Sequence, residues 1–175
     1  MQKVLFGIIS FIAVLFVYNF FFKQPSFNSG TSAPPIKTQL IDGSKFDLED
    51  LKGNYILLDF WGSWCGPCIR EIPNLKQVYN QYHDRQYIDA SNFEVVSVAL
   101  EKSDKYTRKI ITDRGLNWPY HIIDVSRIVM LSDLAQAYDV KELPTKFLIN
   151  PEGKIMRTNP SFEEIAQLLD NRIKK

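Results

Sequence analysis

Residues 59–68 read Asp-Phe-Trp-Gly-Ser-Trp-Cys-Gly-Pro-Cys, and they contain both cysteines of the 175-residue chain. Two cysteines separated by two residues close only a very small loop, so a disulfide between them adds little stability through chain entropy. Redox chemistry explains the pair better. Disulfide exchange needs one thiolate that attacks and a second thiol close enough to resolve the mixed disulfide.

The stretch from Gly66 to about Tyr82 carries an apolar stripe with helical spacing. The i, i+3 spacing of the cysteines places both sulfurs on one face, close to the start of this helix. Unpaired amides and the helix dipole stabilise a negative sulfur there. We therefore expect Cys65 to be the exposed, attacking thiolate and Cys68 to be the resolving thiol. Pro67 lacks an amide hydrogen and stiffens the turn between them.

A zinc site is the structural alternative for the two cysteines. Zinc would need about two further ligands, and the chain offers only His83 and His121, which lie outside any zinc-finger spacing. We therefore expect no metal and no cofactor. The formal net charge of +1 gives no general reason to expect a basic surface, so no nucleic acid is expected as a partner.

The rest of the chain predicts an α/β domain, because predicted strands and helices alternate along it. The order indicates a mixed sheet with helices on both faces. The expected elements are a hairpin at 38–47 that turns at Asp42-Gly43, strands at 54–60, 93–100 and 118–124, helices at 66–82, 103–114, 132–138 and 162–173, and a hairpin at 146–157.

An almost unbroken apolar run extends from Val4 to Phe22. A membrane-spanning helix needs about 20 apolar residues, whereas the core of a signal peptide has about 7–15. Residues 1–23 are therefore predicted to be an uncleaved membrane anchor, with a cleaved signal peptide as the alternative. Residues 24–35 are rich in Ser, Gly and Pro and predict a linker, which leaves residues 36–175 as the folded domain.

The charges around this run give a small bias in orientation. Lys3 and the N-terminal amine precede the run, and Lys23 follows it. The positive-inside rule then favours a cytoplasmic N-terminus. We expect a single-pass protein of the bacterial cytoplasmic membrane with its domain on the extracytoplasmic side.

The segment 59–68 resembles the active-site segment of the thioredoxin superfamily. Within that superfamily the chain is most similar to the membrane-anchored, extracytoplasmic TlpA/ResA-like branch, which includes the reductases of cytochrome c maturation. The residues between Ser103 and Asp124 resemble the helix and strand inserted in that branch. Three further segments carry the resemblance: Ile69-Arg-Glu-Ile-Pro73, Tyr138-Asp-Val-Lys-Glu-Leu-Pro-Thr145 and Phe147-Leu-Ile-Asn-Pro-Glu-Gly-Lys154.

The resemblance implies a thioredoxin-like fold with the inserted helix and strand, which adds to the N-terminal hairpin predicted from the sequence. It also implies that the Leu143–Pro144 bond is cis and lies beside the disulfide, where the backbone before the proline pairs with a substrate strand. Trp64, Gly66 and Pro67 are expected to complete the substrate-binding surface.

Two carboxyl groups are candidate proton carriers. Asp59 ends an apolar strand six residues before Cys65, and a buried carboxyl group has a raised pKa and can exchange a proton with Cys68. The resemblance to the buried aspartate of thioredoxin favours this role, although the closest branch often has a non-acidic residue there. Glu71 matches a glutamate that tunes the cysteines in that branch. An ordinary polar strand end and an exposed helix residue are the respective alternatives, and we rank Asp59 first.

The leading functional hypothesis is a monomeric thiol-disulfide oxidoreductase that reduces extracytoplasmic client proteins and receives electrons from a thiol donor in the membrane. Gly-Pro between the cysteines resembles the reducing thioredoxins. The alternatives are an oxidase or isomerase on the same scaffold and a non-enzymatic partner-binding module. A peroxiredoxin-type peroxidase is not expected, because its site needs Thr/Ser-x-x-Cys on a Pro-led loop.

Overall fold

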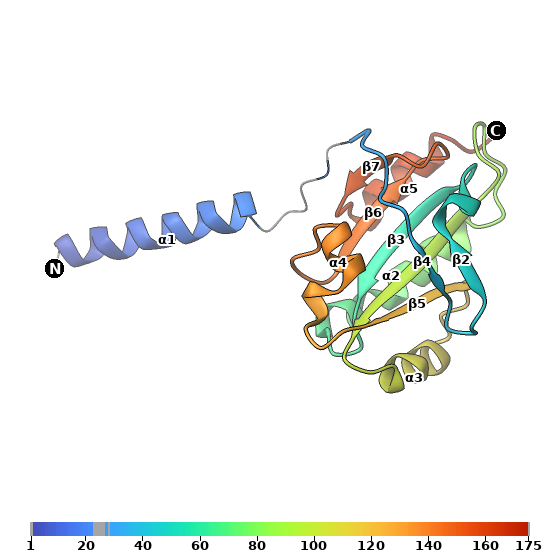
Figure 1. Cartoon of the computed structure of the whole chain (residues 1–175). Helices are drawn as coiled ribbons and strands as arrows, with labels where there is room; N and C mark the ends of the chain where they lie inside the picture. Colours follow the sequence, from blue (N-terminus) through green and yellow to red (C-terminus); the bar gives the residue numbers. More distant parts are fainter. Residues whose placement is uncertain (1, 23–26, 28, 175) are drawn as a thin grey trace.

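The computed structural model describes the backbone of residues 2–22, 27 and 29–174, and Figure 1 shows its course. A five-stranded sheet with the order β5-β4-β3-β6-β7 forms the centre. The parallel strands are β3 (Tyr55–Trp61), β4 (Phe93–Glu101) and β5 (Tyr120–Val125), and the antiparallel ones are β6 (Thr145–Ile149) and β7 (Ile155–Thr158). The predicted mixed sheet is confirmed.

Two apolar clusters cover the two faces of this sheet. Helices α2 (Gly66–Tyr82) and α5 (Phe162–Asp170) contribute to one of them. The other is covered by α4 (Asp133–Ala137) and by the N-terminal segment with its short helix η1 (Leu48–Leu51). Every residue of β3 is buried, as expected for a central strand with both faces covered.

Alternation along β3 decides which of its side chains reach the active site. Successive side chains of a strand point to opposite faces of the sheet. Leu57 and Trp61 belong to the cluster on the α2 side, whereas Leu58 and Phe60 belong to the cluster on the other side. Asp59 therefore points toward α2, which is the helix that carries the cysteines.

The hairpin predicted from the sequence and the insertion expected from the TlpA/ResA-like branch are both present. An N-terminal hairpin pairs β1 (Lys37–Gln39) with β2 (Lys45–Asp47). The insertion forms α3 (Lys105–Arg114) and β5, and α3 ends at Gly115, whose φ of 58° suits the left-handed C-terminal cap. A further short helix, η2 (Val129–Leu131), precedes α4.

Element ends differ from the predictions by a few residues. The final helix stops at Asp170 rather than 173, and the strand expected at 118–124 begins at Tyr120. Pro73 lies inside α2, which continues to Tyr82. The structure also extends the folded domain into the predicted linker: the Gly30 amide donates to the Ile155 carbonyl at 2.8 Å. Residues 23–26 and 28 of the linker lie outside the described residues.

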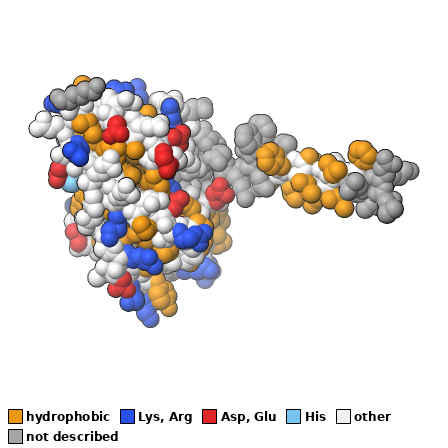
Figure 2. All heavy atoms as spheres, turned by 180° about the vertical axis from the view of Figure 1, so that it is seen from behind, with side chains coloured by type: hydrophobic (Ala, Val, Ile, Leu, Met, Phe, Trp, Pro, Cys, Tyr) orange, Lys and Arg blue, Asp and Glu red, His pale blue; other side chains and the backbone are white. Residues whose placement is uncertain are grey.

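Helix α1 (Gln2–Phe22) covers the predicted membrane anchor. Its described side chains are exposed, including Phe6, Phe11 and Phe16, and Figure 2 shows hydrophobic groups along it. Over the residues that the structure describes, no helix is long and apolar enough to cross a membrane. The predicted transmembrane helix is therefore not supported.

Candidate active site

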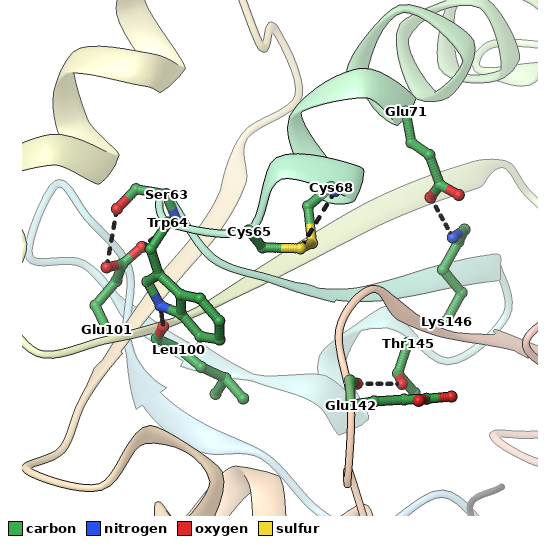
Figure 3. Close-up of a disulfide and its surroundings, with 10 residues drawn as sticks. All are labelled: Ser63, Trp64, Cys65, Cys68, Glu71, Leu100, Glu101, Glu142, Thr145 and Lys146. Atoms are coloured by element: carbon green, nitrogen blue, oxygen red, sulfur yellow. Dashed lines mark hydrogen bonds and ion pairs between the residues drawn. A yellow bond between two sulfur atoms is a disulfide. The ribbon is translucent and has the colours of Figure 1, made fainter. Parts of the chain in front are cut away.

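Cys65 and Cys68 form a disulfide at the N-terminus of α2, as Figure 3 shows. Cys65 is the N-cap residue of the helix, and its Sγ accepts the backbone amide of Cys68 at 3.2 Å. Pro67 lies in the first turn, where a backbone amide has no partner within the helix and its loss costs nothing. The sulfur of Cys65 thus lies where a helix favours negative charge.

The exposed fraction of Cys65 is smaller than the sequence predicts. Cys65 and Cys68 are each only 4% exposed, whereas Gly66 and Pro67 between them are exposed. The expectation of an exposed Cys65 is wrong for this oxidised state, because both cysteines belong to the apolar cluster that contains Trp61. The exposed Gly66–Pro67 turn leaves this side of the pair open to solvent.

The Leu143–Pro144 peptide bond is cis, as the resemblance implied. Both residues are partly buried, and Pro144 lines a small cavity together with Cys68. Thr145 follows, and its hydroxyl donates to the Glu142 carbonyl at 2.7 Å. The loop before β6 therefore faces the same end of the sheet as the disulfide (Figure 3).

Asp59 is 7% exposed, and burial raises the pKa of its carboxyl group from 3.8 to about 6. The ammonium group of Lys146 opposes this rise, and the carboxylate of Glu71 adds to it. Lys146 lies directly opposite Asp59 in the antiparallel register of β3 and β6. Burial therefore brings the pKa of Asp59 closer to neutral pH, and the charge of Lys146 limits this rise.

Lys146 links the two candidate carboxyl groups. It is only 6% exposed, and its Nζ donates to Oε2 of Glu71 at 2.5 Å. A buried ammonium group needs such a partner, because an unpaired buried charge is very costly. Sequence reasoning missed Lys146, although a lysine directly before the apolar residues 147–149 of a predicted strand is a usable signal for a buried ion pair.

Asp59 and Cys68 line the same cavity of about 10 Å³, together with Glu71 and Ser97. A space of about that size accommodates one water molecule where polar groups surround it. A proton can pass between the carboxyl group and the Cys68 sulfur by way of such a water. Asp59, the predicted proton carrier, thus lines the same cavity as Cys68, the predicted resolving cysteine.

The loop before Cys65 is fixed to the end of β4. The buried carboxylate of Glu101 accepts the Ser63 amide at 2.5 Å and the Ser63 hydroxyl at 3.0 Å. The indole Nε1 of Trp64 donates to the Leu100 carbonyl at 3.0 Å. Sequence reasoning missed Glu101, because only the parallel pairing of β3 and β4 brings their ends together.

All nine predicted site residues lie at or near one end of the sheet: Asp59, Trp64, Cys65, Gly66, Pro67, Cys68, Glu71, Leu143 and Pro144. In the part of the chain that the structure describes, no group of three or more His, Cys, Asp or Glu side chains is placed to hold a metal ion. The reactive groups that this site offers are the disulfide and the ionisable side chains beside it.

The sequence of the chain matches those of known proteins. Residues 29–158 match the AhpC/TSA family. The chain is 36% identical over 142 residues to the thiol-disulfide oxidoreductase ResA of Bacillus subtilis (strain 168), which covers 81% of this chain and 73% of the relative.

Solved structures agree with this match. The thioredoxin domain of a thiol-disulfide oxidoreductase from Bacteroides vulgatus aligns with a TM-score of 0.72 at 25% identity, over 85% of this chain and 100% of the other. A thiol-disulfide oxidoreductase from Bacteroides fragilis NCTC 9343 aligns with a TM-score of 0.69 at 26% identity, over 81% of this chain and 98% of the other. The chain therefore belongs to the AhpC/TSA family, within its ResA-like relatives, and it is a thiol-disulfide oxidoreductase of thioredoxin-like fold.

Proposed function

We propose that this protein reduces disulfides in extracytoplasmic client proteins. The observation that carries the proposal is the position of the Cys65 sulfur at the N-cap of α2, where it accepts the Cys68 amide. The same amide and the helix dipole stabilise the Cys65 thiolate once the pair is reduced. A stabilised thiolate beside a second thiol is what disulfide exchange requires, and Gly66-Pro67 between the cysteines resembles the reducing thioredoxins.

In the first step, the Cys65 thiolate attacks one sulfur of a client disulfide. The client S–S bond breaks, a mixed disulfide between Cys65 and the client forms, and the other client sulfur leaves as a thiolate that takes a proton. In the second step, Cys68 loses its proton and attacks the Cys65 sulfur. The client leaves as a dithiol and the Cys65–Cys68 disulfide forms, so two electrons pass to the client.

Asp59 accepts the proton of Cys68 in the second step. A carboxyl group with a pKa of about 6 is largely ionised at neutral pH, yet it remains a stronger base than an ordinary aspartate. Lys146 keeps the carboxylate form available by its charge. A thiol protein of the membrane restores the dithiol afterwards.

The test is a reaction of the fully reduced, full-length chain with insulin, followed by turbidity as the insulin chains separate. Wild-type protein should accelerate the reduction in the presence of a dithiol. Cys68→Ser should instead accumulate a covalent complex with the client through Cys65. A partner-binding module would show neither effect, and that result would reject the proposal.

We also propose that α1 attaches the domain to a bilayer, with the domain on the extracytoplasmic side. The support is the exposed apolar surface of its described residues, since such surfaces mark membrane or protein contacts. Alkaline extraction of membranes tests the attachment, and a phosphatase fused after Lys175 tests the side. Release of all protein by alkali would reject an integral attachment.

The clients that we propose are c-type apocytochromes, whose haem-binding cysteines must be reduced before haem is attached. The support is the resemblance to the branch that contains reductases of cytochrome c maturation. Deletion of the gene should abolish covalent haem in membrane cytochromes, and added dithiol should restore it. Normal haem staining without the gene would point to other clients.

A further inference from the structure

Large apolar side chains that are exposed gather on one edge of the folded domain. Three parallel strands end at this edge, because β3, β4 and β5 run in the same direction. Of the six such side chains described outside α1, five follow or end these strands, and only Ile88 lies elsewhere. The five are Trp64, Tyr106, Val125, Ile128 and Leu131.

A groove of about 560 Å³ opens on this edge. It is lined among others by Trp64, Tyr106 and Val129, with Glu101 and Lys102 beside them. An adjoining groove of about 370 Å³ shares Trp64 and Tyr106. We call the two together the Trp64–Tyr106 groove. Trp64 directly precedes Cys65 in the chain, so the groove begins at the residue next to the predicted attacking cysteine.

One of the two aromatic walls of the groove is held in place although it is exposed. Trp64 is 55% exposed, yet its indole is fixed by the bond to the Leu100 carbonyl. Tyr106 is 62% exposed and projects from α3, the inserted helix. Aromatic surfaces that are fixed before binding lose little conformational freedom when a partner covers them.

The charges at the groove favour a polypeptide with an acidic or neutral flank. Lys102 lines the groove, and Lys105 Nζ lies 5.8 Å from the centre of the Tyr106 ring. The Glu101 carboxylate is occupied by Ser63, and Asp104 pairs with Arg108 at 3.0 Å. The cationic groups at the rim are therefore more available to a partner than the anionic ones.

We propose that the Trp64–Tyr106 groove binds the client segment next to the cysteine under attack, and that it selects clients with a large apolar side chain beside that cysteine. The inference rests on the proposed function, because the client must present its disulfide to Cys65. A client segment is favoured over other occupants because Trp64, which lines the groove, is the residue next to Cys65. A segment that reaches Cys65 from the exposed turn passes over Trp64 and places its neighbouring side chain in the groove.

The experiment uses two peptides that differ at one position. Each carries one cysteine linked to thionitrobenzoate, with Trp or Ser two residues from the cysteine and Asp at a common position. Attack of the reduced, full-length chain on the peptide sulfur releases coloured thionitrobenzoate and leaves the peptide on Cys65. The ratio of the two second-order rate constants measures selection by the groove.

Wild-type protein should react about tenfold faster with the Trp peptide, the effect expected from burying part of a large apolar side chain. Tyr106→Ala and Val129→Ala, at two residues that line the groove, should each lower this ratio severalfold. Ile88→Ala is the matched control, because Ile88 is equally apolar and 65% exposed but lies away from the groove. Its ratio should equal that of wild type.

A wild-type ratio near one, or a ratio that survives Tyr106→Ala, would overturn the proposal. So would a dimer that dissociates on Tyr106→Ala, because the groove would then be occupied by a second copy of the chain. Failure of the proposed function looks different: wild-type protein would react with neither peptide and would not reduce the symmetrical thionitrobenzoate disulfide. The occupant of the Trp64–Tyr106 groove is tested by the ratio and by the oligomeric state.

Discussion

The two sulfurs of the disulfide face different surroundings. Next to Cys68 lies a polar group of side chains in which the buried Lys146 pairs with Glu71 and lies opposite Asp59 in the strand register. Next to Cys65 lies an exposed apolar surface that begins at Trp64. The difference indicates a division of labour, in which one side of the site handles a proton and the other side meets the client. Changes on the two sides should therefore alter different steps.

The largest effect should come from removing the resolving thiol. Cys68→Ser leaves the Cys65 thiolate able to attack but leaves nothing to break the mixed disulfide, so multiple turnover should be abolished. Non-reducing gels should show the covalent complex with the client. Cys65→Ser is the matched control and should form no complex, and a complex of equal amount in both variants would reverse the assigned roles.

Asp59→Asn should slow the second step on the order of 10²-fold, the lower range for loss of a general base. The first attack should change little, because it depends on the other sulfur. Stopped-flow measurement of mixed-disulfide decay and of its formation separates the two steps. Equal slowing of mixed-disulfide formation and decay would contradict the assignment of Asp59 to the second step alone.

The same substitution should stabilise the oxidised protein near neutral pH. The pKa of Asp59 is raised from 3.8 to about 6, so the folded state holds the proton more tightly than the unfolded state does. Stability from this group is then fully present below pH 4 and is lost as the pH rises from about 4 to 6, by about 2–3 kcal/mol in total. Asp59→Asn should remove that loss.

Urea unfolding between pH 4 and pH 8 measures this difference. Glu94, whose pKa burial also raises, contributes a loss of the same sign in both proteins. The comparison of wild type with Asp59→Asn therefore isolates Asp59. Identical pH profiles would show that this carboxyl group is not buried as described.

Lys146→Met should raise the pH at which the rate of the second step reaches its midpoint. The lysine charge lowers the pKa of Asp59, so its removal leaves the carboxyl group protonated to a higher pH. The rate of mixed-disulfide decay, followed from pH 5 to pH 9, should show a midpoint above that of wild type. A midpoint that stays or falls would exclude electrostatic control by Lys146.

The smallest effect should come from Glu101→Gln. The amide still accepts one bond from Ser63, but the charge that strengthens both bonds is lost. We expect the attack by Cys65 to slow only a few-fold, since the bond of Trp64 to the Leu100 carbonyl remains. If mixed-disulfide decay slowed more than formation did, the two sides of the site would not be separate.

Much of this site could be predicted from local sequence. The Trp-Cys-Gly-Pro-Cys motif and the apolar stripe after it fix a disulfide at a helix start. The cis bond before Pro144 came from the resemblance, because local sequence rarely distinguishes cis from trans.

The polar partners could not be predicted. Lys146 faces Asp59 only through the register of two strands that are far apart in the chain, and Glu101 reaches Ser63 only where two strands end together. The burial of Cys65 was also missed, because helix-start chemistry says nothing about how the surrounding cluster covers the sulfur. In each case the missing information is a tertiary contact between segments that lie apart in the chain.

The direction of electron flow is tested most directly by the reduction potential of the Cys65–Cys68 couple, measured on the full-length chain in defined thiol-disulfide buffers. Thioredoxin has a potential of about −270 mV, and the strong oxidant DsbA about −120 mV. A reductase of extracytoplasmic disulfides should lie toward the lower value. A potential near the higher value would contradict the proposed function and would make the protein an oxidase or isomerase.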